Sequence, residues 1–235
     1  MSGARACAVI VAGGSGTRFS ANGPKQFHQV AGRPLLAHTL ERFQTCTAIG
    51  RIALVLPRDG FEESVERMRP FLEAGVSCLA GGDTRQASVW EGLCGLALGE
   101  DDLVVVHDGA RPCADHGVIS RVVEAAAESG AAIAAIPVVE TLKEVETAEG
   151  ELTIRSTVDR ARFFRAQTPQ GFRYRLLARA FEEAQRAGFV GTDEASLVER
   201  LGASVRIVAG SESNIKVTTA EDLERLCLEL DRTVG

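Results

Sequence analysis

Residues 8–18 read AVIVAGGSGTR, and this stretch decides the fold. The run Ala8–Ala12 is wholly apolar, which predicts a strand buried on both faces. Gly13, Gly14 and Gly16 follow it, and glycine lets a backbone approach a ligand closely and point its amides at it. The sequence therefore predicts a buried first strand that ends in a phosphate-binding loop.

Short apolar runs alternate with amphipathic stretches along the rest of the chain. The predicted strands are Ala8–Ala12, Ile52–Leu56, Leu103–Val106, Ala131–Pro137 and Val205–Val208. The predicted helices are Leu35–Phe43, Glu62–Leu72, Thr84–Leu98, Val118–Glu128, Arg175–Ala187, Asp193–Leu201 and Ala220–Leu230. Near-continuous apolar strands separated by helices predict an α/β fold with a mostly parallel sheet covered on both faces. A length of 235 residues suits one domain over residues 1–235.

The stretch Val139–Asp159 departs from this alternation. It is polar, turns at Glu149-Gly150, and alternates charged side chains with apolar ones at Leu142, Val145, Leu152 and Ile154. This pattern predicts an antiparallel β-hairpin. Because a two-stranded hairpin is marginally stable alone in water, we expect a protruding arm at about residues 139–159 that packs on a second subunit.

The composition indicates a soluble globular protein. Hydrophobic residues make up 45% and charged residues 25% of the sequence, close to the globular average. The net charge of -6 argues against general binding to nucleic acid or to anionic membrane. No apolar run approaches the roughly 20 residues of a membrane helix. The first residues also lack a signal peptide's apolar region, so we expect a cytoplasmic protein.

Two common phosphate-binding motifs fail to match the loop after the first strand. A dinucleotide fingerprint needs a third glycine where Phe19 stands, and residues 23–26 (GPKQ) do not supply the Gly-Lys-Ser/Thr of a Walker A loop. What remains is a Gly-rich loop followed by two cations, Arg18 and Lys25. Cations beside a phosphate cradle suit phosphoryl or nucleotidyl transfer. The plainer alternative is a tight turn with solvated cations.

The loop and a series of later motifs resemble the 2-C-methyl-D-erythritol 4-phosphate cytidylyltransferase family. In chain order they are AGGSGTR at 12–18, PKQF at 24–27, GGDTRQASV at 81–89, HDGARP at 107–112, ETLK at 140–143, TVDR at 157–160, QTPQ at 167–170, TDEAS at 192–196 and NIKVT at 214–218. The resemblance covers nearly the whole chain. Two positions depart from the family: Gly109 stands where Ala is usual, and Phe27 where a hydroxyl-bearing aromatic is common.

The resemblance implies a Rossmann-like nucleotidyltransferase domain that transfers CMP from CTP to 2-C-methyl-D-erythritol 4-phosphate and releases pyrophosphate, in isoprenoid precursor synthesis. Arg18 and Lys25 would be the catalytic cations at the α-phosphate, where negative charge builds up on a five-coordinate phosphorus. Asp83 or Thr84 would cap the helix after the second glycine loop. The residues expected to bind CTP are Ala12, Gly13, Gly14, Ser15, Gly16, Gly81, Gly82, Asp83, Ser88 and Ala110.

Asp108 follows a buried strand, and the carboxyl ends of parallel strands are where α/β sheets place ligands. A carboxylate there could hold Mg²⁺, directly or through water, or form a plain ion pair with Arg111. By resemblance, the acceptor-binding residues are Asp108, Arg111, Thr141, Arg160, Thr168, Thr192 and Lys216. Arg160 would come from the neighbouring subunit of a homodimer. Asp193-Glu194 reads as a helix start without chemistry.

Three alternatives remain at the level of the sequence. The first is a nucleotidyltransferase that acts on another acceptor, namely a sugar or polyol phosphate such as ribitol phosphate, or a molybdopterin; cytidylyltransferases acting on ribitol phosphate share most of these motifs. A nucleotide-binding regulator without turnover would not need Arg18, Lys25 and Asp108 together. A dehydrogenase is disfavoured by Phe19, which replaces the third glycine of the dinucleotide fingerprint.

Overall fold

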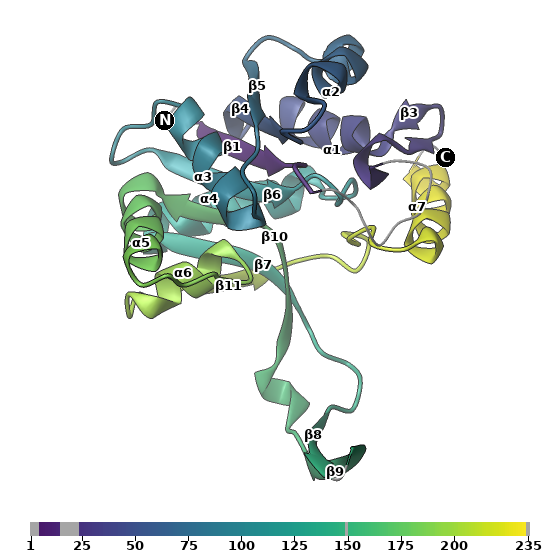
Figure 1. Ribbon diagram of the computed structural model, residues 1–235, viewed down its shortest axis with the longest axis vertical. Helices are drawn as coiled ribbons and strands as arrows, with labels where there is room; N and C mark the ends of the chain where they lie inside the picture. The colour runs from purple at the N-terminus through teal and green to yellow at the C-terminus, as the bar shows by residue number, and fades with distance from the viewer. Residues whose placement is uncertain (1–4, 15–23, 149, 234–235) are drawn as a thin grey trace.

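Seven strands of the described chain form one open sheet, in the order β11-β7-β10-β6-β1-β4-β5 (Figure 1). The computed structural model describes residues 5–14, 24–148 and 150–233. The strands are β1 Ala6–Val11, β4 Ile49–Leu56, β5 Val76–Ala80, β6 Leu103–Asp108, β7 Ala131–Pro137, β10 Phe164–Arg173 and β11 Arg206–Ala209. Neighbours run parallel except at β10, which is antiparallel to both β6 and β7. The expected mostly parallel sheet is confirmed.

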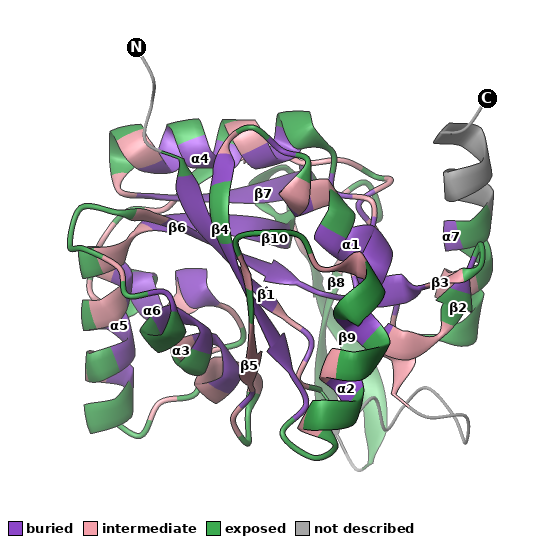
Figure 2. Ribbon diagram, turned by 90° about the horizontal axis from the view of Figure 1, so that it is seen from above, coloured by how far each residue is buried: buried purple, intermediate pink, exposed green. Residues whose placement is uncertain are grey.

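Helices cover both faces of the sheet, so its central strands are buried on both sides (Figure 2). One face carries α1 (Leu35–Gln44), α2 (Phe61–Met68) and α4 (His116–Ser129), and the other carries α3 (Arg85–Gly95), α5 (Tyr174–Arg186) and α6 (Glu194–Arg200). In β1, Ile10 packs toward the first set and Val9 toward the second, because successive side chains of a strand point to opposite faces. Each such burial contributes about 1.5–3 kcal/mol.

The predicted helices are all present, and two of them end more than one residue earlier than expected. α2 stops at Met68, and a 3-10 turn over Arg69–Phe71 follows it. Pro70 is the reason, because it has no N–H to donate within a continued helix. α3 ends at Gly95 rather than Leu98, and Ala97 then takes a positive φ of 46° that no helix contains.

The sequence does not predict β5 or β10. β5 is a short edge strand of half-buried residues, which gives a weak pattern. β10 contains Gln167-Thr168-Pro169-Gln170, which reads as a turn, although its glutamines and threonine are buried. Their side chains bond to loops: the Gln167 amide donates to the carbonyl of Ser211 at 2.8 Å, and the Gln170 amide to the Asp193 carboxylate at 2.8 Å. The polar residues of this central strand therefore anchor loops beside it.

The expected hairpin is present as β8 (Lys143–Ala148) and β9 (Glu151–Thr157), at the end of an arm that stands away from the main body (Figure 1). Gly150 makes the turn with a φ of 87°. Val145 pairs with Ile154, and Thr147 with Leu152. Because alternate residues share a face of a hairpin, Val145, Leu152 and Ile154 form one apolar strip, and all three are exposed.

The last helix, α7 (Ala220–Thr233), packs beside a small hairpin of β2 (Gln29–Val30) and β3 (Arg33–Pro34). Val30, Leu35, Val217 and Leu226 form the buried cluster between them. This cluster fixes the 214–218 segment, which leads into α7 and passes the carboxyl ends of the strands. Within the part of the chain that the structure describes, no helix has both the length and the apolar character needed to cross a membrane.

Candidate active site

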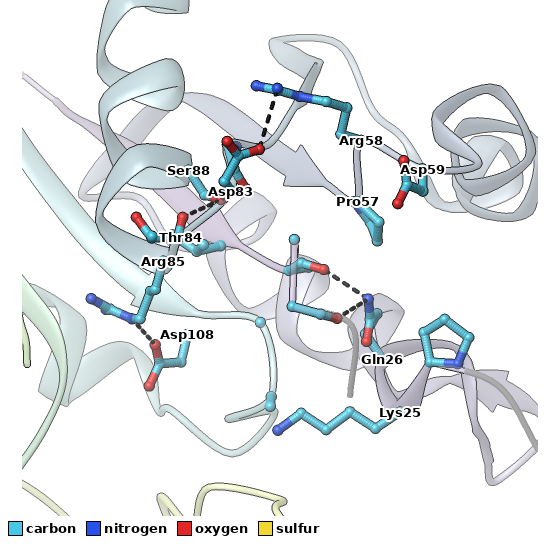
Figure 3. Close-up of a pocket in the computed structure, with 18 of the residues that line it drawn as sticks. Lys25, Gln26, Pro57, Arg58, Asp59, Asp83, Thr84, Arg85, Ser88 and Asp108 are labelled. Carbon is cyan, nitrogen blue, oxygen red and sulfur yellow. Dashed lines mark hydrogen bonds and ion pairs between the residues drawn. The ribbon is translucent and has the colours of Figure 1, made fainter. Parts of the chain in front are cut away.

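A cleft of about 770 Å³ opens where β1 and β6 end (Figure 3). Within the sheet, β4 lies next to β1 on one edge of that strand, and β6 lies next to it on the other edge. Ligands of open α/β sheets bind at such a switch in strand order. The cleft is lined by segments far apart in sequence: 11–14, 24–26, 57–59, 82–85 with Ser88, 108–110, Lys216 and Thr218.

The Gly-rich loop and Lys25 meet on one wall of this cleft. Ala12, Gly13, Gly14 and Lys25 all line it, as expected. Gln26 is buried, and its amide donates to the carbonyls of Ala12 at 2.8 Å and Gly14 at 3.2 Å. Gln26 therefore holds the loop in place, a role that its motif alone does not reveal. The predicted residues Ser15, Gly16 and Arg18 lie outside the described residues.

Lys25 also touches the segment on the opposite side of the cleft. It lies in a 3-10 turn, Lys25–Phe27, and its Nζ donates to the carbonyl of Val217 at 3.0 Å. The N–H of Val217 in turn donates to the carbonyl of Ala110 at 2.9 Å. Lys25, Ala110 and the 214–218 segment are thus tied together around one opening.

The second glycine loop, residues 81–88, forms another wall. Thr84 is the N-cap of α3: its Oγ1 accepts from the N–H of Ala87 at 3.0 Å. The Ser88 hydroxyl donates to the carbonyl of Thr84 at 2.9 Å and accepts from the N–H of Gly82 at 3.1 Å. A Cβ on Gly82 would lie 2.5 Å from the Cβ of Ala87, so the loop can close only around glycine.

Asp83 is exposed and does not cap the helix. One of its carboxylate oxygens lies 3.4 Å from a terminal nitrogen of Arg58, whose Nε donates to the carbonyl of Gly81 at 3.0 Å. Both side chains line the cleft (Figure 3). Of the two N-cap candidates, Thr84 is therefore the right one, and Asp83 remains available at the rim.

Asp108, at the end of β6, is the centre of a buried charge cluster. One carboxylate oxygen accepts from Nε of Arg85 at 3.0 Å. The other lies 2.8 Å from Nζ of Lys216 and 3.6 Å from Nε of Arg111. Thr168 joins them, because its Oγ1 accepts from the backbone N–H of Asp108 at 3.1 Å. The structure thus brings together four predicted acceptor residues: Asp108, Arg111, Thr168 and Lys216.

The cations fix the ionisation of this cluster. Burial by itself raises the pKa of Asp108, but the charges of Arg85 and Lys216 outweigh burial and hold that pKa well below its ordinary value. Burial opposes protonation of Arg85, yet Glu194 and Asp108 raise its pKa. Asp108 is therefore a carboxylate, and Arg85 a cation, across the range in which enzymes work.

His107 lies directly beneath this cluster and is neutral. It is buried, and burial lowers its pKa to about 4. Its Nε2 lies 3.0 Å from the carbonyl of Arg111, so the proton is on Nε2 and donates there. The ring packs on Phe43 with a centroid separation of 4.6 Å. His107 is a packed core residue and does not reach the cleft.

The surroundings of Asp108 do not suit direct binding of a metal ion. Both of its oxygens already face cations, and a bound Mg²⁺ would add a further positive charge. Among the described residues, no group of three or more Asp, Glu, His or Cys side chains is arranged to hold a metal. Asp59 and Asp83 line the cleft separately. These residues do not form a protein cage for magnesium.

The other three predicted acceptor residues do not line the cleft of this chain. Thr141 and Arg160 lie on the arm and are exposed. Arg160 begins a short 3-10 turn, Arg160–Arg162, and donates to the carbonyl of Val139 within the arm. Thr192 is exposed just before α6.

Two charged residues of the cluster, Arg85 and Glu194, are not predicted from the sequence as site residues. Arg85 donates through both terminal nitrogens to Glu194, at 2.7 and 3.0 Å, besides its bond to Asp108. Both residues stand inside motifs of the family, but their spacing of 109 residues hides the pairing. Glu194 begins α6, yet its side chain is buried. Its interpretation as a simple helix-start acid is therefore incomplete.

An open sheet with a glycine loop and a cation-lined cleft at its switch point defines a nucleotide-binding α/β protein. The family model described as 2-C-methyl-D-erythritol 4-phosphate cytidylyltransferase matches residues 6–230. The chain therefore belongs to this family, and the resemblance drawn from its motifs is confirmed.

Individual relatives agree over nearly the full length. The 2-C-methyl-D-erythritol 4-phosphate cytidylyltransferase of Acidobacterium capsulatum is 42% identical over 226 residues, which cover 94% of this chain and 95% of that one. The enzyme of the same name from Syntrophus aciditrophicus is 43% identical over 220 residues and 92% of both chains. The crystal structure of the Thermus thermophilus enzyme is 38% identical, with a TM-score of 0.76 over 97% of this chain and 100% of that one. The expected nucleotidyltransferase fold is confirmed.

Proposed function

We propose that this protein transfers CMP from CTP to 2-C-methyl-D-erythritol 4-phosphate, giving 4-diphosphocytidyl-2-C-methyl-D-erythritol and pyrophosphate. The observation that carries the proposal is the meeting of Lys25, the two glycine loops and the Asp108 cluster around one cleft. Two polyanions can be held there on opposite sides, the nucleotide over the loops and the acceptor phosphate over the cluster.

The reaction is an in-line displacement at the α-phosphorus of CTP. A phosphate oxygen of the acceptor forms the new P–O bond, and the bond to the bridging oxygen of the β-phosphate breaks, so that pyrophosphate leaves with that electron pair. The acceptor phosphate is already ionised at neutral pH, so no covalent enzyme nucleophile is needed. The chain has to align the two phosphates and stabilise charge as it develops.

In this proposal Lys25, with Arg18, stabilises the negative charge that gathers on the α-phosphoryl oxygens. CTP is bound by the predicted loop residues, with the backbone of Gly81 and Gly82 beside Asp83 and Ser88 facing the base. Lys216 and Arg111 bind the acceptor. Asp108 holds Lys216 at 2.8 Å, while Arg111 is held by a hydrogen bond to the carbonyl of Asn214 at 2.8 Å and by its ion pair with Asp108 at 3.6 Å. Lys25, Lys216 and Arg111 each have an oxygen partner before substrate arrives, so little reorganisation of these three cations is needed during reaction.

We propose that the reaction requires Mg²⁺ but that the protein supplies few of the metal's ligands. Mg²⁺ is commonly held by phosphate oxygens of a nucleotide and one or two carboxylates. Because Asp108 is surrounded by cations, we expect the nucleotide to supply most of the ligands. Excess chelator should abolish turnover, and added Mg²⁺ should restore it; full activity in chelator would refute the metal requirement.

We also propose a homodimer in which each arm reaches the partner's cleft. The exposed apolar strip of Val145, Leu152 and Ile154 supports this, because it needs a covering surface. Two-fold interfaces of this kind are the commonest. Thr141 and Arg160, which do not line their own cleft, would then complete the other subunit's acceptor site. A cytoplasmic location is also proposed, since the six cysteines, all within the described residues, are in the thiol form that suits a reducing compartment.

The test is a pyrophosphate-release assay with pure protein, CTP, Mg²⁺ and a panel of acceptor phosphates. We expect turnover with 2-C-methyl-D-erythritol 4-phosphate and at most weak turnover with ribitol 5-phosphate. Replacing CTP with UTP gives a matched control for the base. Preference for ribitol 5-phosphate would contradict the proposed acceptor.

A further inference from the structure

Glu194 is an unusual residue for the place it occupies. Its side chain is about 1% exposed at the start of α6, and it is not among the residues that line the cleft. Burying a carboxylate is costly unless it is paired and hydrogen-bonded. Here both oxygens accept from Arg85, at 2.7 and 3.0 Å. Two parallel bonds of this kind fix the plane of a guanidinium group as well as its position.

The fixed plane of Arg85 decides where its third donor points. With both terminal nitrogens engaged by Glu194, the Nε–H faces Asp108 and donates to one carboxylate oxygen at 3.0 Å. The other oxygen of Asp108 is then left to Lys216 at 2.8 Å and Arg111 at 3.6 Å. The orientation of the Asp108 carboxylate is thus set by Arg85, which lines the cleft beside it.

We propose that Glu194 is a positioning residue that acts through Arg85 and Asp108 to orient Lys216 and Arg111 toward the acceptor phosphate. This inference rests on the proposed function, since it assigns these two cations to the acceptor. It predicts that the acceptor half of the cleft depends on a side chain that no substrate touches.

The CTP half of the cleft has its own supports and does not need this relay. Thr84 caps α3, and Ser88 bonds to both Thr84 and Gly82, with no contribution from Glu194. Gln26 holds the first glycine loop independently. A change at Glu194 should therefore alter acceptor kinetics selectively.

The turn that carries Glu194 also has separate anchors. The Asp193 carboxylate accepts from the N–H of Ser196 at 3.0 Å and from the Gln170 amide at 2.8 Å. The N–H of Ala195 donates to the Gln170 side chain at 3.0 Å. Glu194→Gln has nearly the same shape, so it removes the charge while these anchors keep α6 in place.

The experiment measures KM and kcat for both substrates in Glu194→Gln, in Arg85→Lys and in the double variant. Lysine keeps the positive charge of Arg85 but cannot bridge both carboxylates. We expect each single variant to lose about tenfold or more in kcat/KM for the acceptor, as misplaced contacts do, while KM for CTP stays within about twofold. The double variant should be no worse than the poorer single one, since residues that act as a unit are not additive.

The matched control is Glu128→Gln, which breaks an exposed Glu128–Arg206 pair of 2.6 Å between α4 and β11 and should leave both substrates unaffected. Equal losses for CTP and acceptor, or acceptor kinetics within about twofold of wild type in either single variant, would overturn the proposal. Arg85→Lys tests the same relay if Glu194→Gln does not fold. A wild-type protein without turnover would overturn both this inference and the proposed function, whereas an active wild type with an unchanged Glu194→Gln overturns this inference alone.

Discussion

The cleft and the arm of this molecule differ in whether their side chains find partners within the same chain. Asp108 lines the cleft and Glu194 lies outside its lining, and both are buried with a cationic partner within hydrogen-bond distance. On the arm, Leu152 is 74% exposed and Ile154 is 65% exposed. These two buried carboxylates are thus paired inside the body, while apolar groups on the arm face solvent.

This difference is informative because a buried charge and an exposed apolar surface each carry a cost when they have no partner. A buried charge without partners destabilises a fold by several kcal/mol, and an exposed apolar strip promotes association. The charge cluster around Asp108 is therefore complete within a single chain. In our proposal the arm, which carries Thr141 and Arg160, packs on a partner subunit. The following predictions test each half of this contrast.

The largest effect should come from Lys25→Ala. In the proposed mechanism Lys25 stabilises charge that develops only in the transition state, so turnover should fall by about 10²–10³-fold while CTP affinity changes by only a few-fold. Turnover at saturating CTP and Mg²⁺, with separate titration of CTP binding, measures both. An exposed cation far from the cleft, Arg206, provides the control through Arg206→Ala. Near-normal turnover of the Lys25 variant would rule out a catalytic role.

A second prediction concerns the buried, neutral His107 beneath the cluster. Its pKa is lowered to about 4 in the folded protein from an ordinary value of 6.5, so the unfolded chain takes up the proton first as pH falls. Wild type should therefore lose about 3 kcal/mol of unfolding free energy between pH 6.5 and 4 that His107→Leu does not lose. Denaturant unfolding at several pH values measures this difference.

The control for His107 is His116→Asn, measured in the same way, because it replaces an exposed histidine at the start of α4. If the His107→Leu protein and the wild type lose stability in parallel, the imidazole is protonated in the folded state, which would contradict its neutral, buried environment.

A smaller effect is expected from placing charges on the arm. Ile154→Glu puts a carboxylate in the apolar strip, so it should shift the protein toward monomer and reduce activity by about tenfold at dilute protein concentration, without lowering the thermal stability of the body. Light scattering and activity against protein concentration measure it. Val190→Glu, at another exposed apolar residue, should change neither quantity. A dimer unaffected by Ile154→Glu would place the interface elsewhere.

The sequence predicts the elements in which apolar residues recur in a regular pattern. It misses the elements whose burial depends on contacts with distant parts of the chain. Residues 8–12 indicate a doubly buried strand because five apolar residues in a row, closed by glycines, suit little else. β10 is not predicted, because Gln167 and Gln170 are polar residues of the kind usually found in turns. Their amides are buried in the fold, where they donate hydrogen bonds to the loops at residues 211 and 193. No local pattern contains that information.

The same limit applies to the candidate site. Lys25, Asp108 and Lys216 could be named from motifs, and the fold brings them to one cleft. Arg111 and Thr168 could be named in the same way, and the fold places them against Asp108. Glu194 could not be understood, because its partner Arg85 lies 109 residues away. An acidic residue at the start of a helix is explained by the helix dipole alone, so the sequence gives no reason to expect that Glu194 is buried.

The most direct test of the contrast between cleft and arm is subunit complementation. Lys25→Ala damages the cleft and Arg160→Ala damages the arm, so neither homodimer should be active. In a mixed dimer one site collects both lesions and the other collects neither. Random exchange makes half the dimers mixed, each with one good site, so activity per chain should return to about a quarter of wild type. No recovery after verified exchange would show that Arg160 serves its own chain's cleft and would contradict the account.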